Sequence, residues 1–452
     1  MVPPRIADWF ATEIPNMDLP TPNGRTILRR VRHLSLLLTI PPMLLLLLEI
    51  SQTSASPRTQ RSVEFTGGAI GNGIADDTTA IQSVLNSGKT VVLGTGKVYR
   101  ISQRLNILFD NTGIVGDGTT TLLMGSRPGE FDNASAEYAT RYLENAVGIY
   151  AVGIQSPVVD RVRIRFENQI DDRYVKAIAF RNCKRIRISR NDISNFTKSN
   201  GMIYVGGSQR GSISRNHIYD GYTNSATWGQ MTAIAFDDDD VGSSDIVVDS
   251  NFIHDLVVGP DFLAKFNVQT DGIDPLTRAT RITVSNNFID NVGEGIDLMG
   301  IQNVVESNII TNAKLFGIKI IHGASGNIVR NNIIIDSGIG GIVLAGTSQL
   351  ANTERPTNSN EITGNTILGV NSDQQRKSRT YGIGISGNHG NEYLVTGNSI
   401  MNNSIALEGT GKIGIFVAPL SGSGNIVSGN TITGWSAKEY DVDPSVATLV
   451  VP

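Results

Sequence analysis

The sequence contains little cysteine, little histidine and few charged residues, and each of these shortages excludes a class of fold or function. Its 452 residues include one cysteine, Cys183, and 5 histidines, which excludes a disulfide framework and a cysteine-based zinc cluster. Charged residues make up 18%, and the 38 Lys and Arg do not outnumber the 42 Asp and Glu. We therefore expect no nucleic-acid partner, because nucleic-acid binding relies on an excess of basic charge.

Long hydrophobic runs are scarce as well, and residues 34–48 form the one long example. This run follows a basic cluster at 25–33 and precedes a small polar stretch at 51–56, which is the order found in secretory signals. Interrupted by Pro41 and Pro42, it is shorter than the roughly 20 residues that span a bilayer. We expect residues 1–33 to be a disordered extension and 34–56 a signal peptide or membrane anchor, the only part in contact with a membrane. Either places the protein outside the cell, at the cell surface or in the periplasm.

Glycine, in contrast, is abundant. The 48 glycines exceed 10% of the chain, against an average of about 7%. A chain of this length is too long for one ordinary core of about 100–200 residues, and 40% hydrophobic residues argue against wholesale disorder. This composition favours a stack of short strands joined by tight turns.

One pattern recurs from residue 186 onward: Ile or Val, two residues, Asn, one residue, Ile. Its nine asparagines are Asn191, Asn216, Asn251, Asn287, Asn308, Asn332, Asn365, Asn398 and Asn430. The shortest steps, 21 to 25 residues, match one coil of a parallel β-solenoid, and longer steps add a loop. We expect each Asn to adopt the left-handed backbone of a bend and to stack on the next in a hydrogen-bonded ladder. A β-sandwich with turns at chance spacing would not keep nine repeats in phase.

A second pattern, x-Gly-Ile-x, stays in phase with the asparagines. Its six glycines are Gly272, Gly295, Gly317, Gly341, Gly382 and Gly414. We interpret it as a second strand in each coil, with glycine marking another bend. The two patterns predict an all-β parallel solenoid over residues 62–440, followed by a C-terminal tail at 441–452.

The start of this region carries a further signal. Asp76-Asp77-Thr78 is expected to cap a short helix that runs to about Asn86 and closes the open end of the stack, within a cap spanning 62–105. This segment resembles the N-terminal region of pectate-lyase-like proteins, and the likeness extends over about 62–435. The resemblance implies a single-stranded right-handed parallel β-helix with a short N-terminal capping helix. It also implies action on polysaccharides, since the superfamily includes polygalacturonase- and rhamnogalacturonase-type hydrolases, pectate lyases, mannuronan C5-epimerases and phage tailspikes.

Stacking brings residues one coil apart into contact. If the frame glycines are equivalent, Asp274, Asp297 and Lys319 form a column with steps of about 4.8 Å, and Asp271 and Glu294 form a neighbouring column. We expect these side chains to face outward, with Asp274 and Asp297 roughly 5 Å apart. Such proximity raises a carboxyl pKa and suits acid/base glycoside chemistry. The alternative is a surface salt-bridge ladder.

Other candidates surround this column. His322 follows Lys319 by three residues and is a potential proton carrier. Three aromatic residues of earlier coils, Tyr204, Tyr222 and Trp228, are candidates for stacking on sugar rings. The run Asp237, Asp238, Asp239 and Asp240 is interpreted as a solvated acidic loop or as a Ca²⁺ site that also lines the substrate cleft through Asp237. His217 and His254 are expected to be ordinary surface or turn residues.

Two family motifs resemble the same stretch. Gln269-Thr-Asp-Gly-Ile-Asp274 is similar to Asn-Thr-Asp-Gly-Phe-Asp of the polygalacturonase-type hydrolases, which implies a catalytic role for Asp271. Glu294 stands at the first acid of that family's Gly-Asp-Asp-Cys-Ile motif, Gly295 replaces the second, and Phe316 replaces its histidine. In the epimerases, Tyr-Gly-Phe-Asp-Pro-His corresponds to residues 271–276, where only the acid, the glycine and the proline match.

These observations lead to a hypothesis with two alternatives. The protein is expected to be an extracellular enzyme that cleaves glycosidic bonds of a polysaccharide, with Asp274 or Asp297 as acid/base, Asp271 and Glu294 as partners and Lys319 as charge stabiliser. The first alternative is a lyase or C5-epimerase that acts on uronates through Lys319 and Ca²⁺. The second is a non-catalytic glycan-binding adhesin or spike, either monomeric or homotrimeric.

Overall fold

The computed structural model of the chain divides into two units, Met1–Ser62 and Val63–Pro452. The residues that the structure describes all lie in the second unit: 65–125, 146–167, 174–225, 229–236, 241–265, 268, 270–346, 355–370, 380–386, 394–407, 412–419, 421–435 and 437–450. The predicted extension at 1–33 and the predicted signal or anchor at 34–56 lie outside these ranges. Within them, no helix combines the length and the apolar character needed to cross a membrane.

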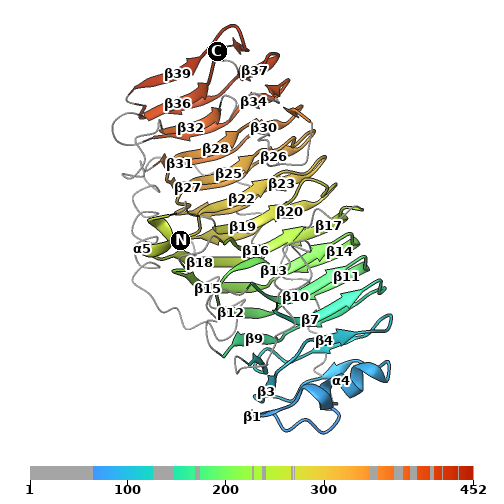
Figure 1. The fold of residues 1–452 in the computed structure, drawn as a ribbon. Coiled ribbons are helices and arrows are strands. Elements are labelled where there is room, and N and C mark those ends of the chain that lie inside the picture. Colours follow the sequence, from blue (N-terminus) through green and yellow to red (C-terminus); the bar gives the residue numbers. More distant parts are fainter. Residues whose placement is uncertain are drawn as a thin grey trace, which may run out of the picture. The chain divides into compact units, whose positions relative to one another are not determined.

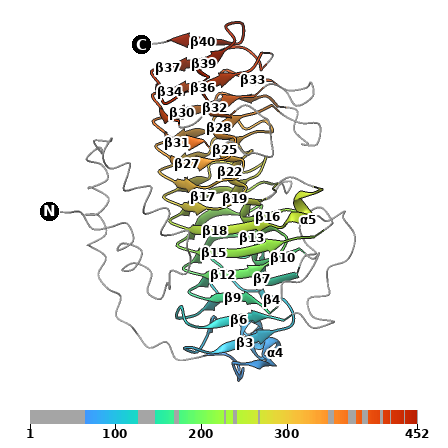
Figure 2. The same ribbon diagram turned by 90° about the vertical axis from the view of Figure 1, so that its left-hand side faces the viewer.

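Val63–Pro452 is a solenoid of three parallel sheets, stacked coil on coil from β1 at one end to β39 and β40 at the other (Figures 1 and 2). The 12-stranded sheet consists of β4 (Leu105–Ile107), β7 (Ala146–Val152), β10 (Val175–Arg181), β13 (Ser199–Gly206), β16 (Met231–Phe236), β19 (Thr270–Pro275), β22 (Glu294–Leu298), β25 (Phe316–Ile320), β28 (Gly340–Leu344), β32 (Thr380–Ile385), β36 (Lys412–Val417) and β39 (Lys438–Val442).

The other two long sheets have 13 strands each. The β2–β40 sheet consists of β2 (Val91–Val92), β5 (Gly113–Val115), β8 (Val158–Asp160), β11 (Lys184–Ser189), β14 (Gln209–Ser214), β17 (Ser244–Asp249), β20 (Thr283–Ser285), β23 (Val304–Glu306), β26 (Ile328–Arg330), β30 (Glu361–Thr363), β34 (Ser399–Met401), β37 (Asn425–Ser428) and β40 (Ala447–Val450). The β1–β38 sheet consists of β1 (Asn72–Asp76), β3 (Val98–Ile101), β6 (Thr121–Met124), β9 (Arg163–Phe166), β12 (Asp192–Phe196), β15 (His217–Thr223), β18 (Phe252–Val258), β21 (Phe288–Asp290), β24 (Ile309–Thr311), β27 (Ile333–Ser337), β31 (Thr366–Val370), β35 (Ser404–Ala406) and β38 (Thr431–Thr433). A short pair, β29 (Thr357–Asn358) with β33 (Val395–Thr396), and helix α5 (Pro260–Leu263) complete the elements beside the cap.

Each full coil visits the three long sheets in the same order, and each strand pairs in parallel with its equivalents in the coils before and after. For example, β19 pairs with β16 on one side and β22 on the other. The frame isoleucines line the core: Ile273, Ile296 and Ile318 are opposite one another and fully buried. Burying one such side chain contributes roughly 1.5–3 kcal/mol. The prediction of a right-handed parallel β-helix is confirmed.

The asparagine ladder is also present. Asn287 donates from Nδ2 to Oδ1 of Asn308 at 2.9 Å and to the carbonyl of Val248 at 3.0 Å, and the same pattern repeats in the other coils. These amides are buried, so loss of one partner would leave another polar group unsatisfied, at a cost of about 1–3 kcal/mol. The left-handed residue of the bend is the one before the ladder Asn, such as Asn286 at φ 55°. Our placement of the ladder Asn itself in that conformation was wrong.

One of the nine asparagines predicted for this ladder, Asn398, was also assigned wrongly, and Asn403 occupies its place. Asn365 donates to Asn403 at 3.0 Å, and Asn403 donates to Asn430 at 2.9 Å. Asn398 belongs to a second, parallel ladder, in which it donates to Asn425 at 3.1 Å. The local pattern misled because both asparagines follow a Val or Ile by three residues and precede an Ile by two.

The frame glycines lie within strands and not at bends, contrary to our interpretation. A Cβ on Gly295 would stand 2.5 Å from the carbonyl oxygen of Gly317 and 2.6 Å from Cγ2 of Ile310. Gly341 faces the same obstacles, at 2.7 Å from the Gly382 oxygen and from Ile367. Glycine is therefore required at this position because adjacent coils and the neighbouring sheet leave no room for a side chain.

The capping helix α4 (Thr78–Asn86) is confirmed, with Asp77 at its N-cap. The carboxylate of Asp77 does not bond to the helix, however. It accepts hydrogen bonds from the amides of Ile70 and Gly71 and so fixes the preceding loop. At the other end the solenoid continues past the predicted boundary at 440, since β40 pairs with β37.

Candidate active site

The x-Gly-Ile-x frame explains how the acids meet on one face. Ile273 belongs to the core, and a Cβ on Gly272 would also point into it, toward Ile289. Because these two consecutive residues both face inward, the residues on either side of them, Asp271 and Asp274, are left on the outer side of the same strand. The same geometry repeats at β22 and β25.

Register then places the charged residues of successive coils side by side. Asp271 pairs with Glu294, and Asp297 pairs with Lys319, as the spacing predicted. Lys319 Nζ donates to Oε2 of Glu294 at 2.6 Å and to Oδ2 of Asp297 at 2.7 Å. We call Asp271, Asp274, Glu294, Asp297 and Lys319 the acid cluster.

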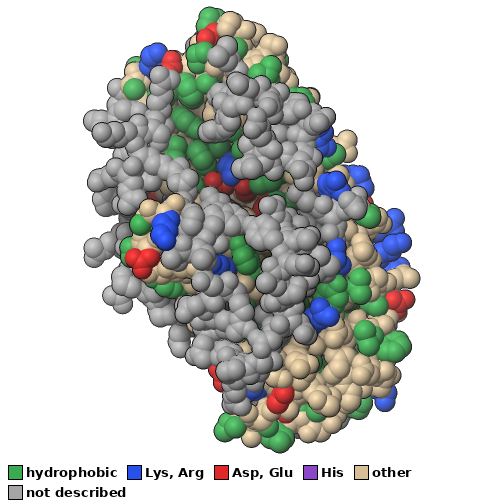
Figure 3. Space-filling model, viewed as in Figure 1, with side chains coloured by type: hydrophobic (Ala, Val, Ile, Leu, Met, Phe, Trp, Pro, Cys, Tyr) green, Lys and Arg blue, Asp and Glu red, His purple; other side chains and the backbone are tan. Residues whose placement is uncertain are grey.

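The cluster is more buried than the sequence led us to expect. Asp271, Asp274, Glu294 and Asp297 are only 2–6% exposed, whereas the Lys319 side chain is 18% exposed. Figure 3 shows acidic and basic side chains together on the outer face, with hydrophobic ones around them. A solvated salt-bridge ladder would leave its carboxylates in water, so burial argues against that alternative.

Burial and mutual repulsion change the protonation of these acids. Burial raises the pKa of Asp271 to about 7; the charge of Glu294 adds to this, and Lys319 opposes it. Burial also raises the pKa of Glu294 to about 7, against the lowering effect of Lys319. The pKa of Asp297 is raised by burial, while Lys319 again acts in the opposite direction.

Lys319 remains charged. Burial alone would lower its pKa, but Asp297, Glu294 and Asp271 together raise it well above its usual value. The cluster therefore holds one ammonium group and, near neutral pH, acids that retain part of their protons. Such mixed protonation is typical of acid/base sites.

Asp297 has one oxygen that is open to a further hydrogen bond. Oδ1 of Asp297 is buried, and no group among the described residues donates a hydrogen bond to it. The Asp297 and Glu294 carboxyl groups are in contact and affect each other's pKa. A proton held by Glu294, a water molecule or a substrate hydroxyl can therefore satisfy this atom.

Three acids of the cluster are close enough to contact one cation. One carboxylate oxygen each from Asp271, Glu294 and Asp297 lies within 4.8 Å of the others, and carboxylate oxygen is the type of ligand that Ca²⁺ accepts, although Ca²⁺ takes about six to eight such ligands. The Lys319 ammonium, however, is bonded to two of these three acids. A dication would have to lie beside this charge, so the residues present do not fit one. The Ca²⁺ site predicted at Asp237–Asp240 lies outside the described residues.

The remaining predicted residues are dispersed. His322 is half-buried in the turn after β25, at φ 56°, three residues beyond Lys319. Tyr204 lies on the outer face but is completely buried among Val147, Ala179 and Ala235, so its ring is not available to stack on a sugar. Tyr222 is 41% exposed on β15, in a different sheet from the acids. Trp228 lies outside the described residues.

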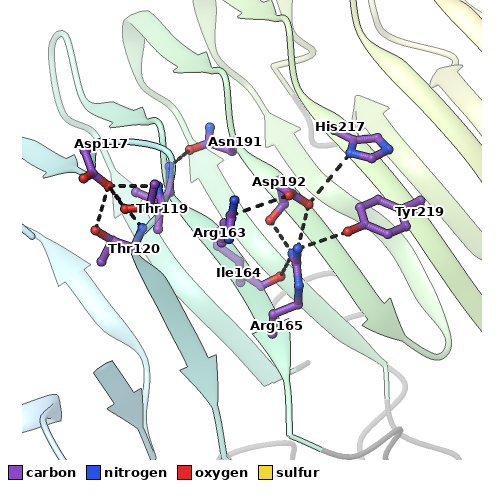
Figure 4. Close-up of polar contacts among 11 residues, drawn as sticks. Asp117, Thr119, Thr120, Arg163, Ile164, Arg165, Asn191, Asp192, His217 and Tyr219 are labelled. Atoms are coloured by element: carbon purple, nitrogen blue, oxygen red, sulfur yellow. Dashed lines mark hydrogen bonds and ion pairs between the residues drawn. The ribbon is translucent and has the colours of Figure 1, made fainter. Parts of the chain in front are cut away.

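His217 and His254 are more organised than expected. They lie on neighbouring strands of the β1–β38 sheet, with 2.8 Å between their Nε2 atoms. Figure 4 shows His217 beside Asp192 and Tyr219, with Arg165 donating to both of these residues. Burial, followed by the charges of His254 and Arg165, lowers the pKa of His217 to about 2, so it is neutral at physiological pH.

Two contributors to the site were missed. Gln230 donates to Oδ2 of Asp271 at 2.6 Å, and Thr232 donates to the same oxygen at 3.3 Å. Thr232 pairs with Asp271 in the preceding coil, where Thr232-Ala-Ile-Ala235 is the same frame with alanine in place of glycine. Extending the frame one coil toward the N-terminus would have found Thr232. Gln230 precedes the strand and carries no such signal.

Comparison with known proteins agrees with this architecture. A family model described as a right-handed beta helix region matches residues 275–367. A search of curated protein sequences found no match to the chain.

Several solved structures have the same fold. PfbA, a surface adhesin of Streptococcus pneumoniae, is 13% identical over 83% of this chain and 92% of that one, with a TM-score of 0.53. The Dettilon tailspike protein is 15% identical over 85% of this chain and 66% of its own length, with a TM-score of 0.52. The catalytic domain of a GH87 alpha-1,3-glucanase, in complex with nigerose, is 12% identical over 88% and 69%, with a TM-score of 0.51. At these identities the likeness shows the fold alone.

Proposed function

We propose that this chain, which has the fold of a right-handed parallel β-helix, is an extracellular enzyme that cleaves glycosidic bonds in a polysaccharide. The observation that carries this proposal is the acid cluster, in which four acids are buried on the outer face of successive coils and two of them, Glu294 and Asp297, bond to one ammonium group. Burying charges this way is costly, and the fold does not require it. The glucanase among the structures that share the fold supports the choice of substrate class.

Asp271 and Glu294 supply the proton in this proposal. A general acid works best when its pKa is close to the working pH, and burial places the pKa of both groups at about 7. Glu294, in contact with Asp297, protonates the leaving glycosidic oxygen. Gln230 and Thr232 orient the Asp271 carboxyl group, and burial, together with the charge of Asp297, keeps Glu294 protonated.

Asp297 is the proposed partner acid. Its Oδ2 is held by Lys319, and its Oδ1 is available to the substrate or a water molecule. The spacing of at most 4.8 Å between carboxylate oxygens is closer to the roughly 5 Å of double displacement than to the 6.5–9.5 Å that leaves room for an attacking water. Asp297 then attacks the anomeric carbon, and Glu294 later takes the proton from the water that releases the sugar. Asp274, adjacent in the same column, is expected to support Asp297.

One observation favours a second candidate, a lyase or epimerase acting on uronates. The Lys319 ammonium is permanently charged and partly exposed, which suits it to neutralise a uronate carboxylate. The same high pKa prevents Lys319 from acting as the base, so Glu294 or Asp297 would have to abstract the proton. A non-catalytic adhesin is the remaining alternative.

An assay panel separates the three candidates. Polygalacturonate, rhamnogalacturonan, alginate, inulin and an α-glucan are incubated with the protein and with its Glu294→Gln variant, and both reducing ends and the absorbance of unsaturated products are measured. The proposal predicts reducing ends without unsaturated products and none from the variant. Unsaturated products would instead identify a lyase. Binding without any product from a folded protein, together with a trimer on sizing, would identify an adhesin or spike.

A further inference from the structure

A second feature lies on a different sheet from the acid cluster. Six cationic side chains from two successive coils are exposed on the outer face of β11 and β14 and at the adjoining bends, namely Lys184, Arg185, Arg187, Arg190, Arg210 and Arg215. We call them the arginine face. In Figure 3, basic side chains gather along the right-hand edge of the view, where Figure 1 has β11, β14 and β17. This concentration is notable in a chain whose formal net charge is −4.

Among the described residues, most of these cations have no carboxylate in an ion pair with them. Arg190 is paired with Asp160 at 2.8 Å, and Arg185 bonds to the neutral Gln155. Across the described ranges, no carboxylate forms an ion pair with Lys184, Arg187, Arg210 or Arg215. In the next coil, Asp245 stands opposite Arg210 and attracts it, but its ion pair is with Arg281, at 2.7 Å. Within the described part of this sheet, the cations that lack a carboxylate ion pair are therefore those of β11, β14 and their bends.

The backbone gives an independent reason to regard the arginines as selected for more than structure. Arg185, Arg190, Arg210 and Arg215 all adopt left-handed backbone, with φ between 54° and 62°. Side chains with a Cβ are disfavoured there, and Asn or Gly is better suited. In later coils the bend position of Arg215 is occupied by Ser250, Asn286, Ser307, Asn331 and Gly364, and arginine recurs in left-handed backbone only at Arg281 among the described residues beyond Arg215. Four left-handed arginines in two successive coils, next to Arg161 in the coil before them, are a local concentration of an unfavourable choice, which points to function.

We propose that the arginine face binds an anionic polysaccharide, separately from the acid cluster. Equivalent cations recur at one coil step, about 4.8 Å, and so form lines of charge that match a linear polymer with regularly spaced carboxylates or sulfates. Arginine donates bidentate hydrogen bonds to such groups. No exposed large aromatic or aliphatic side chain of the described residues lies on β11 or β14, which disfavours nucleobase stacking and membrane insertion. The choice of a polysaccharide rests on the proposed function.

The chain offers a matched pair of variants to test this. Arg210→Asn with Arg215→Asn removes two unpaired cations and installs the residue that the backbone prefers. Arg281→Asn, the control, removes an arginine from the same bend column as Arg210, but one already neutralised by Asp245. All proteins carry Glu294→Gln, so that binding is measured without cleavage and its failure is distinct from a failure of the proposed reaction.

Binding to polygalacturonate, inulin and a single-stranded DNA is measured at low and high salt by calorimetry. We expect salt-sensitive binding of polygalacturonate and none of inulin. The double variant weakens polygalacturonate binding roughly five- to tenfold, since each exposed ion pair contributes modestly, whereas Arg281→Asn leaves it unchanged. Thermal midpoints of the double variant should equal or exceed those of the parent. Equal loss in both variants, no loss in the double variant, tighter binding of the DNA, or no binding at all would overturn the proposal.

Discussion

Two parts of the 12-stranded sheet have the same backbone frame and opposite outer surfaces. In β19, β22 and β25 the outer columns carry the acid cluster, whereas in β28, β32 and β36 the same columns carry Val343, Tyr381, Ile413 and Phe416. We call the coils of β28, β32 and β36 the apolar coils. Val343, Tyr381 and Ile413 are buried in a cluster of their own, against which the half-buried Phe416 and, from β25, the half-buried Phe316 pack.

The core side of the two parts is nearly identical. Ile318, Ile342 and Ile383 are opposite one another, and the frame glycines meet the next coil in the same way. The frame therefore accepts either outer surface, and the apolar one is cheaper because buried charges must be desolvated. The acid cluster is therefore not a requirement of the fold, which supports the chemistry proposed for it.

The largest expected effect is on turnover. Glu294→Gln removes the proposed proton donor while conserving shape, and should lower kcat by about 10²–10⁴-fold, the usual contribution of general acid catalysis. Ile413→Val, in the same column of the apolar coils, should keep kcat near that of the parent and cost about 0.5–1.5 kcal/mol of stability. Steady-state kinetics and denaturant unfolding check both. Equal turnover of Glu294→Gln and the parent would contradict the assignment.

Removal of the ammonium group should affect stability most. Lys319→Met leaves Glu294 and Asp297 buried without their cation, and we expect a loss of about 3–5 kcal/mol in the free energy of unfolding, typical of a broken buried ion pair. Adding Glu294→Gln and Asp297→Asn should recover much of this loss, because the unpaired charges are then absent. If Lys319→Met cost less than about 1 kcal/mol, the ion pairs would have to be open in solution.

Stability should fall as the pH rises. The folded-state pKa values of Asp271 and Glu294 are about 7, above their unfolded values, so the folded protein binds more protons between about pH 4 and 7. The free energy of unfolding is expected to decrease across this window, by on the order of 7 kcal/mol when both groups titrate independently. Asp271→Asn with Glu294→Gln should make the free energy of unfolding nearly independent of pH in this window. Ile413→Val should lower that free energy by the same amount at every pH. A stability that rose through this window in the parent protein would conflict with the account.

The smallest expected effect tests the shared frame. Gly295→Ala and Gly341→Ala each place a Cβ within 2.5–2.7 Å of a carbonyl oxygen, and both should destabilise by about 1–3 kcal/mol. Only Gly295→Ala, adjacent to Glu294, should also lower turnover. Unfolding curves that differ widely between the two variants would show that the two parts do not share one frame.

The repeats made most of the fold predictable. Asp297 and Lys319 are separated by one short coil without a long loop, so their pairing could be predicted from their spacing in the sequence alone. Spacing could not separate Asn398 from Asn403, because two ladders five residues apart give the same local pattern. It also could not assign the frame glycines, since a bend and a close carbonyl contact both demand glycine.

The candidate site was only partly predictable for a related reason. Periodicity gives neighbours within a sheet but not their exposure, so the burial of Asp271 and the resulting pKa shift did not follow from it. The hydrogen bond from Gln230 to Asp271 could not be predicted either, because Gln230 lies outside the repeat. The arginine face was overlooked because its residues depart from the Asn and Gly pattern that marks the bends.

The central claim is that two acids of the cluster hold protons near neutral pH, and a direct titration tests it. Carboxyl carbons of the labelled protein are followed by ¹³C NMR as the pH is raised, with Asp271→Asn and Glu294→Gln used to assign the resonances. The account predicts that these two carboxyl groups titrate with midpoints near 7, apart from the ordinary acids near 4. Midpoints near 4 for both would contradict it and leave the cluster a set of ionised surface carboxylates.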